Sequence, residues 1–286
     1  MDVMVNFKEL ESPYFIGEIG INHNGDMQIT KKLIDAVNAC GWHCAKFQKR
    51  NPDVCVPEHQ KNILRQTPWG EMTYIDYKHK IEFGEEQYNF IDDYCRQKPV
   101  DWSASVWDFD SLEFLMQYDL PFLKIPSAMM TNKELVSETA KTGKAVIMST
   151  GMSSLEEVDS AVENLLSTTD NFVLMHTNSS YPTPKEEINL SLIPFLKNRY
   201  DCVVGYSGHE KDLEPTVIAA ALGATVIERH ITLSHDLWGT DQKSSLEVLA
   251  MDMLQKRVQD VNLIMGEPKK VVTESEISIR HKLRGK

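Results

Sequence analysis

The sequence lacks the features that mark secreted, membrane-spanning and nucleic-acid-binding proteins. It has no apolar run long enough to cross a bilayer, and Met1–Leu10 has no signal-peptide character. Its five cysteines are odd in number and show no CxxC spacing, which indicates free thiols in a reducing compartment. A formal net charge of −12 argues against general binding to nucleic acid or anionic membranes. We therefore expect a cytoplasmic protein without a nucleic-acid or membrane partner.

What the sequence does contain is a regular alternation of strand-like and helix-like segments. Between the strand-like runs, segments such as Thr30–Cys40 and Ser154–Leu166 carry apolar residues at helical spacing. This alternation predicts an α/β fold with a parallel sheet and right-handed crossovers. Eight strands suit a closed (β/α)8 TIM barrel, and an open six-stranded sheet is the alternative if two runs are not strands. The predicted strands are residues 14–20, 43–48, 100–104, 122–125, 145–148, 172–176, 202–206 and 225–230.

One catalytic barrel is expected over residues 1–270, because no low-complexity segment or shift in composition divides the chain. Residues 271–286 are expected to form a polar, basic tail beyond it. The segment 51–83 interrupts the alternation, since it is long and rich in charged and aromatic residues. Long loops on a barrel usually serve function, and we interpret 51–83 as an inserted lid.

Polar side chains gather at the C-terminal ends of the predicted strands, where a (β/α)8 barrel builds its active site. The pattern therefore indicates an enzyme. His209 and His230 follow two consecutive strands, in GYSGHE and IERHIT. Adjacent strands lie about 4.8 Å apart, so the two imidazoles can share one divalent ion and leave positions open for water and substrate. His176, at the preceding strand end, is a candidate for a supporting hydrogen bond.

Two lysines lie inside apolar runs, Lys46 in CAKFQ and Lys124 in LKIPS. A buried ammonium is costly unless it meets an anion, so the pair predicts a site for a phosphate or carboxylate. The alternative is that each lysine extends its ammonium to solvent at a strand end. Polar side chains near the strand ends would complete the anion site: Gln48, Ser105, Ser127, Ser149, Thr150, Ser179 and Ser207.

Two carboxylates are further candidates. Glu18 follows an apolar run and could exchange a proton with a substrate or bind a sugar hydroxyl. The alternative for Glu18 is a structural pair with Lys46 inside the barrel. Asp241 lies in WGTDQKSSLE after the last strand, where it would belong to a shaped loop, although aspartates are common in plain turns.

Together these segments resemble the motifs of the sialic acid synthase family, which condenses phosphoenolpyruvate with acylamino sugars. They occur in the family's order as GEIGINHNGD (17–26), AKFQKR (45–50), FLKIPSA (122–128), MSTGMS (148–153), HTNSSYPTP (176–184), VGYSGHE (204–210), IERHIT (227–232) and GTDQKSSLE (239–247). The resemblance implies a (β/α)8 barrel and a divalent ion bound by His209 and His230. That ion is typically manganese, with magnesium or cobalt as alternatives.

The resemblance also implies a role for each remaining candidate. Phosphoenolpyruvate would be surrounded by Lys46, Lys124, Ser105, Ser127, Ser149, Ser179 and Ser207. The acylamino sugar would face Glu18, Gln48, Tyr181 and Asp241. We assign Glu18, Lys46, Lys124 and Asp241 as catalytic and the others as substrate-binding.

The chain departs from the family pattern at several positions. Met129 stands where synthases of N-acetylneuraminate often have a glutamate, and Ser105-Val106-Trp107 replaces the usual serine/threonine-proline-phenylalanine. Ser179 stands where the family has an asparagine, which neighbouring Asn178 could replace. With Met129 and Trp107 lining the pocket, we predict a less polar sugar than N-acetylmannosamine, such as a 6-deoxy diacetamido hexose. N-acetylmannosamine is the alternative.

Most members of the family carry a C-terminal antifreeze-like domain whose arginine reaches a partner's active site, and the sequence ends at Lys286 without it. We therefore expect the N-acyl group to be bound by lid aromatics, Arg50 or the basic segment Arg280–Lys286, and a homodimer partner to help close the site. Two other functions stay open. One is an aldolase that forms a Schiff base through Lys124 or Lys46, and the other is a sugar-binding protein without catalysis.

Overall fold

The computed structural model describes residues 5–285 and forms a closed barrel of eight parallel strands. Each strand pairs with the next along the chain, and β1 (Tyr14–Gly20) closes the ring by pairing with β10 (Val226–Thr232). Between them lie β2 (Cys44–Lys49), β5 (Asp101–Val106), β6 (Phe122–Ile125), β7 (Ala145–Ser149), β8 (Phe172–Thr177) and β9 (Val203–Gly208). The predicted TIM barrel and all eight predicted strands are confirmed.

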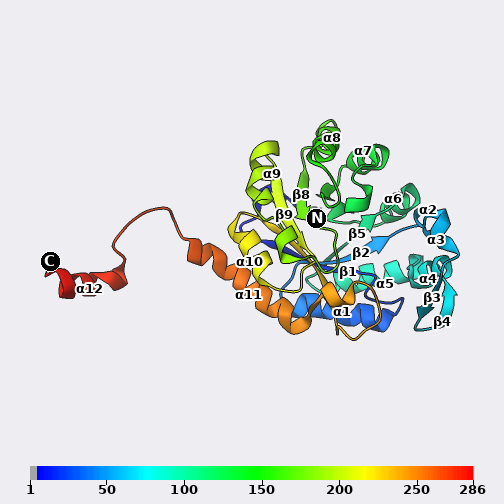
Figure 1. Ribbon diagram of the computed structural model, residues 1–286, viewed down its shortest axis with the longest axis horizontal. Helices are drawn as coiled ribbons and strands as arrows, with labels where there is room; N and C mark the ends of the chain where they lie inside the picture. The colour runs from blue at the N-terminus through cyan, green and yellow to red at the C-terminus, as the bar shows by residue number, and fades with distance from the viewer. Residues whose placement is uncertain (1–4, 286) are drawn as a thin grey trace.

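Helices enclose the barrel, as Figure 1 shows. They are α1 (Met27–Ala39), α5 (Glu85–Arg96), α6 (Phe109–Leu115), α7 (Lys133–Lys141), α8 (Leu155–Leu166), α9 (Leu192–Tyr200), α10 (Glu214–Ala221) and α11 (Val248–Met265). Helix α8 begins with a reciprocal cap between Ser154 and Glu157. The Ser154 hydroxyl accepts from the Glu157 N–H, and the Glu157 carboxylate accepts from the Ser154 N–H at 2.7 Å.

The barrel interior has an apolar lower layer and a polar upper layer. Side chains of a strand point alternately to its two faces, so inward positions repeat every second residue. Tyr14 and Ile16 belong to a buried apolar cluster with Phe122, and Phe7 of the short helix η1 (Phe7–Glu9) packs its ring 5.5 Å from the Tyr14 ring. Two residues further along β1, the same alternation turns Glu18 inward. The alternation along β1 therefore places apolar side chains at the bottom of the barrel interior and a carboxylate above them.

The predicted lid, residues 51–83, folds into small elements gathered on one side of the barrel in Figure 1. They are α2 (Pro52–Cys55), α3 (Glu58–Lys61), the antiparallel hairpin β3 (Leu64–Thr67) and β4 (Gly70–Thr73), and α4 (Tyr74–Ile81). The Tyr77 ring lies 5.1 Å from the ring of Trp238, in the loop after β10. The segment therefore contacts the end of the barrel that carries the polar layer. Its role as a lid stays a prediction.

Beyond α11 the chain runs to helix α12 (Glu274–Arg284), which projects away from the barrel in Figure 1. The segment 271–286, interpreted as a polar tail, thus contains a helix whose residues are all exposed. Residues 1–4 and Lys286, which belong to the predicted barrel and tail, lie outside the described part of the chain. Within residues 5–285, no helix is both long enough and apolar enough to cross a membrane.

Candidate active site

A cavity of about 250 Å³ lies at the C-terminal ends of the barrel strands. Of the residues assigned above as catalytic, substrate-binding or metal-binding, all except Asp241 and Asn178 line it, whereas Thr150 and His176 line a neighbouring cavity. The lining residues are Glu18, Lys46, Gln48, Ser105, Trp107, Lys124, Pro126, Ser127, Ala128, Ser149, Met152, Thr177, Ser179, Tyr181, Ser207, His209, Glu228 and His230. The barrel therefore brings together side chains from seven of the eight motifs, and only GTDQKSSLE (239–247) contributes none.

The floor of the cavity is a network of buried charges. The Lys46 Nζ lies 2.5 Å from a carboxylate oxygen of Glu18, and the Lys124 Nζ lies 2.9 Å from both carboxylate oxygens of Glu228. All four side chains are at most 7% exposed. Lys46 also donates to the Ser105 hydroxyl at 2.9 Å. The structural pair considered for Glu18 is therefore present, and two positive charges balance two negative ones.

Burial and pairing shift the four ionisation equilibria in different directions. Burial raises the pKa of Glu18 to about 7, although the Lys46 ammonium opposes the shift. Burial also opposes ionisation of Glu228, but Lys124 and Lys46 hold its pKa well below the ordinary range. For Lys124, burial lowers the pKa more than Glu228 raises it. For Lys46, the two carboxylates outweigh burial, and its pKa is raised.

Glu228 is the functional candidate that the motifs did not single out. It accepts from Lys124 and from the Ser207 hydroxyl, the latter at 3.0 Å. It lies two residues before His230 on β10, so both side chains point into the barrel. The sequence did contain a signal for Glu228, because a carboxylate directly after the apolar residues Val226 and Ile227 is as unusual as a lysine inside an apolar strand.

The two predicted metal ligands lie side by side, with their ring centroids 5.4 Å apart. The Nδ1 of His209 lies 2.6 Å from the carbonyl oxygen of Asn178. A carbonyl only accepts, so Nδ1 carries the proton and Nε2 keeps its lone pair, 2.9 Å from the Tyr181 hydroxyl. Burial lowers the pKa of His209 to about 3, with His230 contributing, and burial also lowers the pKa of His230. Both rings are therefore neutral, as metal binding requires.

These rings fit a weakly held divalent ion. The Nδ1 of His230 is buried and has no hydrogen-bond partner, which leaves a nitrogen available for coordination. Among the described residues, no cluster of three or more His, Cys, Asp or Glu side chains is arranged to hold a metal. Two protein ligands would leave most positions of the ion open to water and substrate.

Three candidates lie elsewhere than the sequence suggested. Asp241 is in the loop after β10, where it accepts from the Thr240 hydroxyl, although its charge opposes the lowering of the His230 pKa by burial. Asn178 contributes its backbone carbonyl to His209, while its side chain is bound to the backbone of Ser180 and Glu187. His176 contacts the carbonyl of Ile188 rather than the other histidines.

Met129 is absent from the cavity lining. It ends the short helix η2 (Ser127–Met129) and packs against two core clusters, since the helical turn that exposes Ala128 directs the next side chain inward. One of the two substitutions behind the expectation of a less polar sugar is therefore outside the cavity lining. Trp107, the other, is in the lining.

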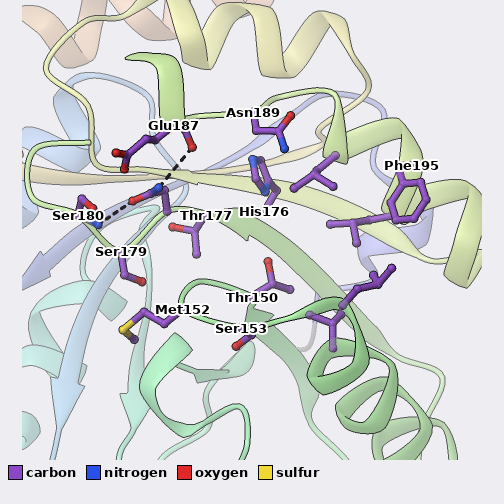
Figure 2. Close-up of a pocket in the computed structure, with 15 residues that line it drawn as sticks. Thr150, Met152, Ser153, His176, Thr177, Ser179, Ser180, Glu187, Asn189 and Phe195 are labelled. Atoms are coloured by element: carbon purple, nitrogen blue, oxygen red, sulfur yellow. Dashed lines mark hydrogen bonds between the residues drawn. The ribbon is translucent and has the colours of Figure 1, made fainter. Parts of the chain in front are cut away.

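A second cavity of about 650 Å³ adjoins the first, and Met152, Thr177 and Ser179 line both. Figure 2 shows its position, with His176 and Phe195 on one side and Thr150 and Ser153 on another. An apolar wall comes from α8 and α9, and the segment between β8 and α9 adds polar side chains. The apolar residues are Leu155, Val158, Leu192 and Leu196, and the polar ones are Asn178, Ser180, Glu187 and Asn189. Ser179 is thus at the boundary between the two cavities.

Comparison with known proteins places the chain among synthases. The model of the NeuB family matches residues 33–270. The human N-acetylneuraminate-9-phosphate synthase is 33% identical over 273 residues, which are 94% of this chain and 76% of that protein. The N,N'-diacetyllegionaminic acid synthase of Campylobacter jejuni is 31% identical over 272 residues, 93% of this chain and 81% of that protein. The sialic acid synthetase of Leptospira borgpetersenii, crystallised with citrate, has a TM-score of 0.85 at 29% identity, covering 96% of this chain and 94% of that one.

The charge network makes a stability prediction with a defined pH dependence. Lys124→Met leaves Glu228 buried with only the more distant Lys46 at 3.7 Å, and should cost about 3–5 kcal/mol of unfolding free energy. In the wild type, the low pKa of Glu228 stabilises the fold above the pKa of the unfolded chain. In the variant, burial raises that pKa, so stability is lost as pH rises through it. Urea titrations should show a larger deficit at pH 8 than at pH 5.

Two further variants serve as controls for this experiment. Adding Glu228→Gln should restore much of the loss, because no unpaired carboxylate remains. Lys141→Met, which removes an exposed pair with Glu138, should cost less than about 1 kcal/mol. If Lys124→Met lowers the unfolding free energy equally at both pH values, the loss comes from packing and not from the unpaired charge.

Proposed function

Because the chain belongs to the NeuB family, we propose that it condenses phosphoenolpyruvate with an open-chain N-acylamino hexose. The products would be a sialic-acid-like 2-keto acid sugar and phosphate. Its relatives are named as N-acetylneuraminate-9-phosphate and diacetyllegionaminic acid synthases, and the chain is an enzyme of this kind. The observation that carries the reaction is the pair of buried lysines on the cavity floor, surrounded by hydroxyl groups and next to two neutral histidines.

The floor supplies what phosphoenolpyruvate needs. Lys46 and Lys124 offer ammonium groups to its phosphate and carboxylate. Ser105, Ser127 and Ser149 add hydroxyl donors from the ends of β5, β6 and β7. An entering anion disfavours the ionised carboxylates already there. Glu18, whose pKa is already near 7, can then take up a proton from solvent and limit the repulsion.

The carboxylates have complementary roles in the proposed reaction. The methylene carbon of phosphoenolpyruvate attacks the aldehyde carbon of the sugar, and the aldehyde oxygen takes a proton, which protonated Glu18 can supply. Positive charge develops on C2 of phosphoenolpyruvate, and ionised Glu228 stabilises it. Water adds at C2 and returns one of its protons to Glu18. Cleavage of the C2–O bond then forms the ketone and releases phosphate, which takes the proton of the C2 hydroxyl. Each proton taken from the site is thereby restored.

We propose a divalent ion, Mn²⁺ by resemblance and Mg²⁺ or Co²⁺ as alternatives, held by His209 and His230. When bound, it would polarise the aldehyde of the sugar. The Asn178 carbonyl fixes the ring of His209, and Tyr181 lies against both histidines, with ring centroids 4.1 Å and 5.6 Å away. The chain's own residues thus orient both ligands and keep them neutral.

For the sugar, we propose an N-acetylmannosamine-like or a diacetamido-trideoxyhexose substrate, in contact with Gln48, Trp107 and Tyr181. The related proteins include both kinds of synthase. The Schiff-base alternative needs a neutral lysine. The two carboxylates raise the pKa of Lys46 and favour its protonated form, which argues against Lys46 as the Schiff-base lysine. For Lys124, whose pKa is lowered by burial, the ion pair to Glu228 opposes the loss of the proton.

We also propose a cytoplasmic homodimer. All five cysteines are free, which suits a reducing compartment. The end of α11 and the projecting α12 expose apolar side chains that a monomer would leave in water, among them Leu263 at 82% and Leu283 at 76%. A second copy of the chain would cover them.

The function is tested by phosphate release from phosphoenolpyruvate in the presence of a panel of acylamino hexoses, including N-acetylmannosamine and 2,4-diacetamido-2,4,6-trideoxyhexoses. Release should require one of these sugars. No release with any member of the panel, together with a borohydride-trapped adduct between pyruvate and Lys124 or Lys46, would replace the synthase by the aldolase.

The metal assignment predicts loss of turnover on exhaustive chelation and its recovery with Mn²⁺. His209→Ala and His230→Ala should each abolish turnover and weaken Mn²⁺ binding in calorimetry by at least about tenfold, with an unchanged circular dichroism spectrum. Full activity of the chelated enzyme would show that the histidines have another role.

The assembly proposal predicts that light scattering gives twice the chain mass of 32.6 kDa. The double variant Ile279→Ser/Leu283→Ser should shift the protein toward the monomer, because it removes apolar side chains from one face of α12. A wild-type protein that is monomeric at assay concentrations contradicts the proposal.

A further inference from the structure

Glu210 and Arg229 form a buried ion pair that the mechanism proposed above does not use. Their side chains are 2% and 0% exposed, and a guanidinium nitrogen of Arg229 lies 2.9 Å from a carboxylate oxygen of Glu210. Each residue is the sequence neighbour of a metal-ligand candidate, since Glu210 follows His209 and Arg229 precedes His230. The ion pair therefore joins the two chain segments that carry the histidines.

The pair lies between the barrel sheet and helix α10. The hydroxyl of Thr216, in the first turn of α10, donates to a carboxylate oxygen of Glu210 at 3.1 Å and accepts from Arg229 at 2.8 Å. Tyr206 of β9 donates to the other carboxylate oxygen at 2.8 Å. Side chains alternate along a strand, so Arg229 points outward on β10 while His230 points into the barrel.

The guanidinium of Arg229 also binds the backbone of the turn that follows β9. It donates to the carbonyl of Asp212 at 3.2 Å and to the carbonyl of Glu210. From another side, the N–H of Thr183 donates to the carbonyl of His209 at 3.2 Å. The turn that begins with His209 is thus held by its backbone as well as by the Glu210 carboxylate.

The Glu210 carboxylate folds back against Gly208, one residue before His209. A side chain at Gly208 would place its Cβ atom 2.6 Å from one carboxylate oxygen of Glu210 and 2.8 Å from the other, which is closer than carbon and oxygen approach without a bond. Gly208 is the register partner of Arg229 in the sheet. A glycine at this position therefore gives the ion pair the room to lie directly beside the two strands that carry the histidines.

The stability of the fold does not by itself explain this pair. Removing two charges from water costs about as much as their attraction returns, so an apolar pair of similar volume is often equally stable. The Nε of Arg229 adds to the cost, because it is buried and has no hydrogen-bond partner within residues 5–285. What the ion pair supplies is a fixed geometry, since its bonds connect the neighbours of both histidines.

We propose that Glu210 and Arg229 are positioning residues that set the spacing and orientation of His209 and His230 toward the divalent ion. This inference rests on the proposed function and adds which residues hold the ligands of the ion. The two ring centroids lie 5.4 Å apart. With only two protein ligands, a small displacement of either ring lowers the affinity of the whole site.

The first measurement is the affinity of the metal-free protein for Mn²⁺, by calorimetry without substrates. Glu210→Gln and Arg229→Met should each weaken binding about tenfold or more. Each should also lower the melting temperature, because an unpaired charge stays buried. The double variant Glu210→Gln/Arg229→Met should recover much of the melting temperature, since neither charge remains, while its affinity for Mn²⁺ stays weak.

The matched control is Asp159→Asn, which breaks another ion pair between an arginine and a carboxylate. Arg199 donates to both carboxylate oxygens of Asp159, at 2.8 Å and 2.7 Å, and the two residues belong to the outer helices α9 and α8. Affinity for Mn²⁺ should not change in this variant. The comparison separates the position of the Glu210–Arg229 pair from the general effect of losing an ion pair.

The second measurement needs no metal. The Nδ1–H of His209 donates to the carbonyl of Asn178 at 2.6 Å, so its proton should resonate far downfield in NMR spectra of protein with isotope-labelled histidine. Loss of the signal in His209→Ala assigns it. In the Glu210→Gln/Arg229→Met variant, the signal should move upfield or exchange faster with water, because the ring is no longer held against the carbonyl. Asp159→Asn should leave it unchanged.

Two results would overturn the inference. One is a Glu210→Gln/Arg229→Met variant that binds Mn²⁺ as tightly as the wild type, which would make the pair purely structural. The other is a His209 proton signal that is the same in this variant as in the wild type. If the signal moves as expected but the wild type binds no Mn²⁺, the pair does position His209, and it is the proposed metal site that fails.

Discussion

The site depends on the pairing of two buried ammonium groups with two buried carboxylates on the barrel floor. Lys46 and Glu18 are on neighbouring strands, whereas Lys124 on β6 reaches Glu228 on β10 across the interior. Four charges removed from water are tolerable only because each meets its opposite at hydrogen-bond distance. The same pairing orients the donors before any substrate arrives, so little reorganisation remains for the reaction itself. The four charges of the floor thus sum to zero, and the two ammonium groups still line the cavity where a substrate would bind.

The barrel can hold this layer because the layer beneath it is apolar and tightly closed. Inward positions two residues apart change from Ile16 to Glu18 on β1 and from Phe122 to Lys124 on β6. Phe7 packs against the base of this lower layer. Water is therefore kept from the barrel below the site, and electrostatic interactions above it stay strong. Stability is provided by one end of the strands and chemistry by the other.

The fold was predictable from the sequence because parallel barrel strands are buried on both faces and read as continuous apolar runs. The same runs located the buried lysines and the histidines, since polar residues stand out beside them. Glu228 was missed because its neighbour Arg229 is also charged. The structure separates the two, with Glu228 facing the barrel interior and Arg229 pairing with Glu210 at 2.9 Å. A single sequence does not reveal which partner each charge meets.

The positions that sequence reasoning misplaced lie in loops and short helices. Asn178 offers its carbonyl instead of its side chain, and Met129 turns into the core, because local backbone geometry decides both. Lys78 gave no signal, since helical lysines are usually exposed. Its burial accompanies the packing of its neighbour Tyr77 against Trp238, far away in the sequence. Long-range packing of this kind has no local pattern from which to predict it.

The distribution of charge is compatible with the proposed anionic substrate, although the protein as a whole is acidic. A net charge of −12 disfavours the approach of an anion at long range. Salt screens that effect beyond about 8–10 Å, whereas contacts in a buried site are screened much less. Affinity must therefore come from short-range groups. The floor provides them as paired lysines, whose charge is matched until an anion competes for it.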